Sequence, residues 1–178
     1  MKTVIEAFFV TLLEDRVRWY CKSMELGSAN ATVQTPDDAI HVLVHCCQGQ
    51  RHDCQHHYLS HSTSWRFESP NNLVLSYIVY PHEKHVGSPT NEWQETLLQD
   101  LRLVHSHSPC DPRPPMIESH HVLSHALRHL ALLTHGPAAD AVVSNHLPES
   151  ARRFLSQVVP ALAGQLPEFH LECSAESC

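Results

Sequence analysis

The feature that most constrains the fold is the apolar run over residues 73–80, Leu-Val-Leu-Ser-Tyr-Ile-Val-Tyr. The run is rich in β-branched and aromatic residues, and both of its alternating faces are apolar. Asn71 and Asn72 precede it and Pro81 follows it, so turn-forming residues bound it on both sides. The run therefore predicts an inner strand, which is stable only when helices cover its sheet.

Two segments before this run predict the other strands of an antiparallel meander. Residues 39–47 alternate between an apolar and a mixed face, and the apolar face comprises Ile40, Val42, Val44 and Cys46. Residues 56–68 also alternate, and one of their faces comprises Leu59, His61, Thr63, Trp65 and Phe67. Residues 69–72 have the composition of a turn. The sequence therefore predicts a small antiparallel β-meander over residues 39–80.

Helices are predicted on both sides of the meander. Residues 2–24 contain no glycine or proline, and their apolar residues recur at helical spacing, which favours one amphipathic helix. The β-branched and aromatic residues near its start leave a strand open as the alternative for residues 2–13. Further helices are predicted over residues 92–104, 116–134 and 148–164. The predicted fold class is therefore α+β, with the meander packed against N-terminal and C-terminal helices.

The length of the chain predicts one domain over residues 1–178. Residues 105–115 contain four prolines, so this segment is predicted to be a rigid internal linker. The tail over residues 168–178 is small and polar, and we expect it to fray.

Composition and missing motifs argue against several classes of protein. The net charge of −7 and the lack of a basic stripe argue against a nucleic-acid partner. No apolar stretch is long enough to cross a bilayer and no signal-peptide pattern is present, so we expect no membrane role and a cytoplasmic location. The seven cysteines are an odd number, and we expect them to stay reduced. The five glycines are too dispersed to build a phosphate-binding loop, and a Gly-x-Ser-x-Gly nucleophile motif is missing.

Histidine is the residue type that most distinguishes the composition. The 17 histidines outnumber the 12 lysines and arginines. Protonation of every histidine would change the net charge from −7 to +10, because imidazole titrates near pH ~6.5. The sequence therefore predicts a surface whose charge changes sign in mild acid.

A dense cluster of histidine and cysteine lies between His45 and His61. Thiolate and imidazole are preferred ligands of Zn²⁺, so the cluster is a candidate zinc site. Its candidate ligands are Cys46, Cys47, His52, Cys54 and His56. Their spacing matches no known zinc finger, and the alternative is a set of ordinary loop histidines and small buried cysteines.

A second histidine pattern lies in the helix predicted over residues 116–134. His121, His125 and His129 are four residues apart, so they form one stripe beside the apolar face of that helix. His125 and His129 border the apolar face, and such a pair can chelate a metal ion. The alternative is a row of half-buried imidazoles that make hydrogen bonds where the helix meets the sheet.

His61 and Arg66 are the remaining candidate site residues. His61 shares its face with apolar side chains, so it is predicted to point at the core or into a cleft, where it would suit general acid–base catalysis. A core histidine with a satisfied hydrogen bond is the alternative. Arg66 is a candidate anion-binding residue on the opposite face, and an exposed cross-strand arginine is its alternative.

Three functions remain open on the sequence alone. The first is a metal-binding protein that uses the histidine and cysteine cluster, with Zn²⁺ as the candidate ion. The second is a non-catalytic interaction or regulatory module with pH-sensitive histidines. The third is a small-molecule enzyme with a cleft centred on His61. The partner is expected to be a small molecule or a protein, and the oligomeric state stays open.

Overall fold

The computed structural model describes residues 1–27, 33–48, 58–81, 92–103, 116–135 and 141–161. A sheet and several helices are formed by these residues, which confirms the predicted α+β class. The elements are β1 (Lys2–Leu12), β2 (Arg16–Glu25), α1 (Pro36–Gln48), β3 (Tyr58–Ser69), β4 (Asn72–Pro81), β5 (Gln94–Leu97), the 3₁₀ helix η1 (Leu98–Asp100), α2 (Ser119–His135), α3 (Ala141–His146) and α4 (Glu149–Leu155).

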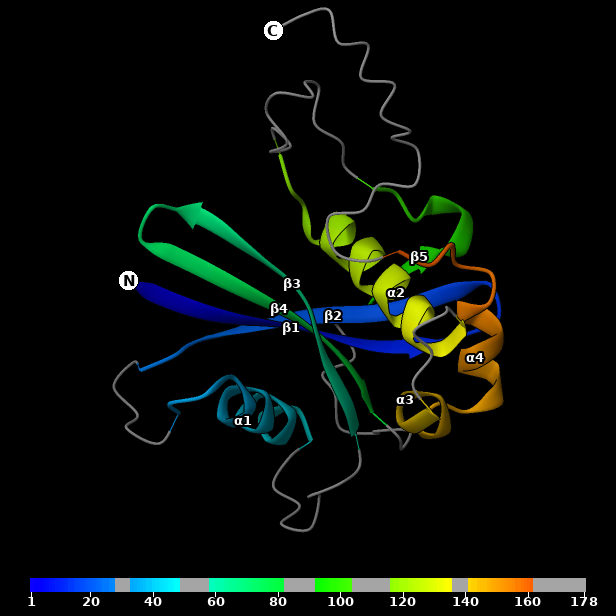
Figure 1. The fold of residues 1–178 in the computed structure, drawn as a ribbon, viewed down its shortest axis with the longest axis horizontal. Helices are drawn as coiled ribbons and strands as arrows, with labels where there is room; N and C mark the ends of the chain where they lie inside the picture. The colour runs from blue at the N-terminus through cyan, green and yellow to red at the C-terminus, as the bar shows by residue number, and fades with distance from the viewer. Residues whose placement is uncertain (28–32, 49–57, 82–91, 104–115, 136–140, 162–178) are drawn as a thin grey trace, which may run out of the picture.

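The strands form one mixed sheet in the order β3-β4-β1-β2-β5 (Figure 1). β1 pairs with β4 in parallel, whereas the β1–β2, β3–β4 and β2–β5 pairs are antiparallel. β4 lies between β3 and β1, which confirms residues 73–80 as an inner strand. The β3–β4 hairpin and its turn also agree with the prediction, because Ser69 pairs with Asn72 at the end of the ladder.

Helices cover both faces of the sheet (Figure 1). On one face, α1 packs in a core that comprises Ile5, Ala7, Phe9, Tyr20, Val33, Ala39, Ile40, Leu43, Val44 and Val79. On the other face, α2, α3 and α4 pack against buried residues of β1, β2 and β4. β1 is therefore buried on both faces, with Ile5 facing α1 and Phe8 facing α2.

The helix predicted over residues 2–24 is wrong, because this segment is the β1–β2 hairpin. The turn is tight, and the amide of Leu13 donates to the carbonyl of Arg16 at 2.9 Å. A half-buried strand alternates between apolar and polar residues, but a strand buried on both faces is apolar throughout. The apolar residues of β1 therefore matched helical spacing by chance.

The strand predicted over residues 39–47 is also wrong, because these residues lie within α1. The Oγ1 of Thr35 accepts a hydrogen bond from the Asp38 amide at 3.2 Å, and a carboxylate oxygen of Asp38 accepts one from the Thr35 amide at 2.9 Å. This reciprocal pair is a capping box, and it fixes the start of the helix. The predicted three-stranded meander over residues 39–80 is thus reduced to the β3–β4 hairpin.

The remaining helix predictions have mixed outcomes. The helix predicted over residues 92–104 is wrong, because residues 94–100 form β5 and η1, and Trp19 of β2 pairs with Gln94 of β5. The helix predicted over 116–134 is confirmed as α2, and the one predicted over 148–164 is shorter, since α4 ends at Leu155. None of the described helices is long and apolar enough to cross a membrane. The predicted linker at 105–115 and the tail at 168–178 lie outside the described residues.

Candidate functional site

α2 places a row of histidines at the border between the helix and β3. Its core-facing side is apolar and comprises Val122, Leu123, Ala126, Leu127, Leu130 and Ala131. His125 and His129 lie one turn apart beside this side, and both are half-buried. α2 packs on β3 and β4, so the two imidazoles lie where the helix meets the edge of the sheet.

His61 of β3 meets His129 of α2 across this border. The two ring centroids are 5.0 Å apart and the rings are nearly perpendicular, at 79°. The predicted core-facing orientation of His61 is consistent with this contact, because its partner in the ladder is the buried Ile78. We call His61, His125 and His129 the histidine seam.

A backbone carbonyl fixes the orientation of His129. Nδ1 of His129 lies 3.3 Å from the carbonyl oxygen of Thr63, which can only accept a hydrogen bond. A neutral His129 that makes this bond therefore carries its hydrogen on Nδ1 and keeps its lone pair on Nε2. Thr63 lies at an irregularity in the β3–β4 ladder, and its own Oγ1 donates to the carbonyl of Ser76 at 3.1 Å.

The protonation of His125 is unfavourable in the folded chain. Burial lowers the pKa of His125, and the neighbouring His129 and Arg128 lower it further. All three effects lower the pKa, because an apolar environment and nearby positive charge both disfavour an imidazolium. Folding therefore opposes the protonation of His125.

The predicted metal ligands are only partly placed by the structure. Among the described residues, no group of three or more histidine, cysteine, aspartate or glutamate side chains is arranged to hold a metal ion. His125 and His129 thus lie on one side of α2 as predicted, without a third ligand from that part of the chain. Cys46 and Cys47 belong to α1, but their side chains, and His52, Cys54 and His56, lie outside the described residues.

Arg66 contacts carboxylates of the chain itself. Its guanidinium binds Glu6 of β1 through two nitrogens, at 2.8 and 3.2 Å, and reaches Glu68 at 3.2 Å. The hydroxyl of Ser76 accepts from Arg66 and donates to Glu6, both at 3.0 Å. Burial alone would lower the pKa of Arg66, but the two carboxylates outweigh it and raise that pKa.

Cys21 is the free cysteine within the described part of the chain. Burial, with a smaller contribution from Glu6, raises the pKa of its thiol to about 12. The thiolate is the form that attacks electrophiles and binds metals, so Cys21 is inert at neutral pH.

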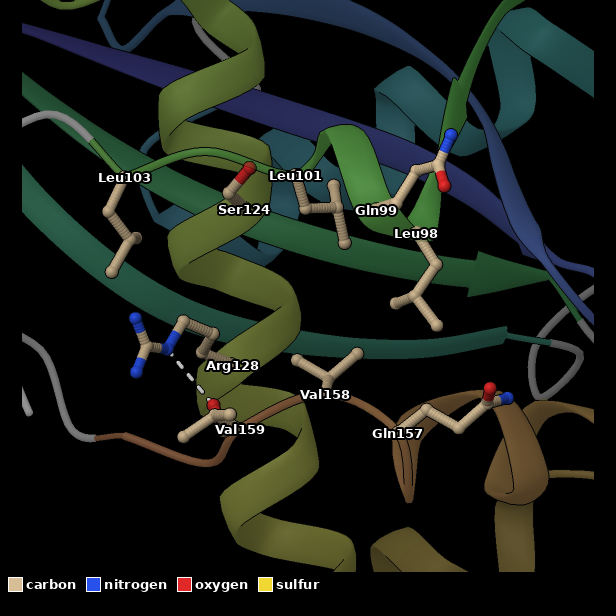
Figure 2. Close-up of a pocket in the computed structure, with 9 residues that line it drawn as sticks. All are labelled: Leu98, Gln99, Leu101, Leu103, Ser124, Arg128, Gln157, Val158 and Val159. Atoms are coloured by element: carbon tan, nitrogen blue, oxygen red, sulfur yellow. Dashed lines mark hydrogen bonds between the residues drawn. The ribbon is translucent and has the colours of Figure 1, made fainter.

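Sequence reasoning missed a groove of about 450 Å³ on a neighbouring side of the same helix (Figure 2). Its walls come from η1 and the residues after it, from α2, and from the residues after α4. The lining residues are Leu98, Gln99, Leu101, Leu103, Ser124, Arg128, Gln157, Val158 and Val159. Nε of Arg128 donates to the carbonyl of Val159 at 2.9 Å, which joins two of the walls. No local pattern signals this groove, because three distant segments build it.

The described geometry thus offers two features, the histidine seam and the groove, on neighbouring sides of α2. No protein-family model matches the chain, and no curated protein matches it.

Proposed function

We propose that the protein is a non-catalytic, pH-responsive binding module in which the histidine seam couples protonation to the packing of α2. The observation that carries this proposal is the ring contact between His61 and His129, which joins the sheet to the helix. Histidine is the side chain whose charge changes between pH 5 and 8, so such a contact responds to mild acid.

The coupling follows from charge repulsion. Two unit charges at the 5.0 Å separation of the His61 and His129 rings repel by about 3 kcal/mol at an effective dielectric constant of about 20. Solvent lowers this value because both rings are only half-buried. Arg128 of α2 adds positive charge beside the seam, since it lowers the pKa of the neighbouring His125.

Protonation of the seam is expected to change the groove, because both features share α2. Ser124 and Arg128 are groove residues, and His125 and His129 directly follow them on α2. A shift of α2 away from β3 therefore also changes one wall of the groove. Since the walls are mainly apolar with a few polar groups, the groove suits a small molecule or a short segment of a protein partner.

We expect the stability of the protein to fall in mild acid. Folding lowers the pKa of His125 below its ordinary value of 6.5, so the unfolded chain binds this proton more readily. The stability that neutral His125 contributes is fully present above pH 6.5, and it is lost as the pH falls through the lowered pKa of His125 in the folded state. We expect a loss on the order of 1 kcal/mol from the seam between pH 7.5 and 5.5, measured by urea unfolding.

A variant isolates the seam from the other histidines. The double change His125→Gln and His129→Gln keeps an amide donor for the Thr63 carbonyl but removes both titrating groups. In this double variant, the difference in unfolding free energy between pH 7.5 and pH 5.5 should be at most half of the wild-type difference. The control His146→Gln, at an exposed residue of α3, should keep the whole difference. A double variant with the full wild-type difference would contradict the proposal.

A further inference from the structure

A second pair of histidines lies on α1, on the opposite face of the sheet from the seam. His41 and His45 are one helical turn apart, and their ring centroids are separated by 4.1 Å at an angle of 72°. In the strand predicted for this segment, the same residues would lie about 13 Å apart, at a rise of about 3.3 Å per residue. The helix is therefore what brings the two imidazoles together.

The backbone under this pair is well fixed. Ile40, Leu43 and Val44 of α1 are buried against the sheet, while His41 is exposed and His45 is half-buried. The capping box between Thr35 and Asp38 holds the start of the helix. The packed and capped helix thus places the two imidazoles side by side before an ion binds, which lowers the entropic cost of binding.

The local charge favours a cation. Asp37 and Asp38 lie in the first turn of α1, and His41 interacts electrostatically with Asp38. Hydrogen bonds from Thr35 and Gln34, with a smaller contribution from His41, lower the pKa of Asp38, so its carboxylate stays ionised well below neutral pH. A negative group one turn before the imidazoles attracts a divalent ion to this side of the helix.

We propose that His41 and His45 form a two-imidazole site for a divalent late transition-metal ion of the Ni²⁺ and Zn²⁺ class. Neutral imidazole nitrogen is a preferred ligand of these ions, and two histidines at i and i+4 on a helix offer their nitrogens to one ion. Water completes the coordination shell. The site uses no residue of the seam or the groove, so it stands independently of the proposed pH response.

The test uses Ni²⁺ as a paramagnetic probe of the full-length reduced chain, followed by NMR. We expect the amide signals of α1 near residues 41 and 45 to broaden at the lowest Ni²⁺ concentrations. The broadening should disappear at pH 5.5, because protonated imidazole cannot bind a metal ion. If the α1 signals do not broaden selectively at neutral pH, the proposal is wrong.

Variants separate this site from the other histidines of the chain. His41→Ala with His45→Ala keeps good helix formers on α1, and it should weaken the apparent Ni²⁺ affinity at α1 by at least about tenfold, the smallest loss typical of removing even a supporting residue of a metal site. His120→Ala with His121→Ala removes another ring pair, 3.9 Å apart but adjacent in sequence, and should leave the α1 broadening unchanged. The change His52→Ala with His56→Ala should also leave it unchanged. Broadening that survives the α1 variant, or that is lost with His52 and His56, would overturn the proposal.

Discussion

Replacing Phe8 with alanine is expected to lower the free energy of unfolding by about 3–5 kcal/mol. Phe8 is fully buried in β1, the central strand of the sheet, and it belongs to the core beneath α2, α3 and α4. Its ring centroid lies 6.0 Å from that of Trp19, so the change removes an aromatic contact as well as filled volume. Because small domains are stable by only about 5–15 kcal/mol, this single change removes a large part of the total.

Urea unfolding at neutral pH, followed by circular dichroism, measures this loss. The matched control is Phe67→Ala on the edge strand β3, where the side chain is 42% exposed. Little burial is lost there, so we expect a change below about 1 kcal/mol. Equal losses for the two variants would show that β1 does not occupy the centre of the core.

The elements that the sequence predicts well have either one buried face or turn-forming residues and proline at their ends. α2 is buried on one side, so its apolar stripe and its histidine stripe separate cleanly in the sequence. β4 follows the turn residues and ends at Pro81, and both signals restrict its bounds. For each of these elements, the pattern of its own residues indicates which sides are buried, so the local sequence is sufficient to predict it.

The elements predicted wrongly fail for two different reasons. β1 is buried on both faces, which removes the alternation that would identify a strand. α1 was predictable, because Thr35-Pro36-Asp37-Asp38 has the spacing of a capping box with proline at the first helical position. The alternation of Ile40, Val42, Val44 and Cys46 competed with this signal, although Ile40, Leu43 and Val44 also match the spacing of one helical face.

The candidate site shows the same division. The sequence places His125 and His129 at the border of an apolar helical face, which the structure confirms. The contact between His129 and His61 depends on β3 lying beneath α2, and the two histidines are 68 positions apart in the chain. The ring contact of His41 with His45 depends only on α1 being a helix. Local contacts follow from secondary structure, whereas the seam and the groove need the tertiary arrangement.

Replacing Glu6 with alanine is expected to cost about 2–3 kcal/mol, although the change removes an ionised side chain. Glu6 is 12% exposed and Arg66 is 21% exposed, so the pair is largely shielded from water. The change leaves the guanidinium without its two-nitrogen partner, and it removes the acceptor of the fully buried Ser76 hydroxyl. The expected loss stays below that of a completely buried pair, because Glu68 and some solvent still reach Arg66.

Two further variants separate the charge from the hydrogen bonds. Glu6→Gln keeps an acceptor for Ser76 but not the negative charge, so it should cost about 1 kcal/mol. Combining Glu6→Leu with Arg66→Met removes both charges, and most of the stability should return because no unpaired charge is left behind. Urea unfolding of these variants, together with the two single apolar changes, forms a double-mutant cycle that gives the coupling energy of the pair. If Glu6→Ala costs less than about 0.5 kcal/mol, Arg66 must find another partner when Glu6 is absent, and an external anion at this position would become the better explanation of its placement.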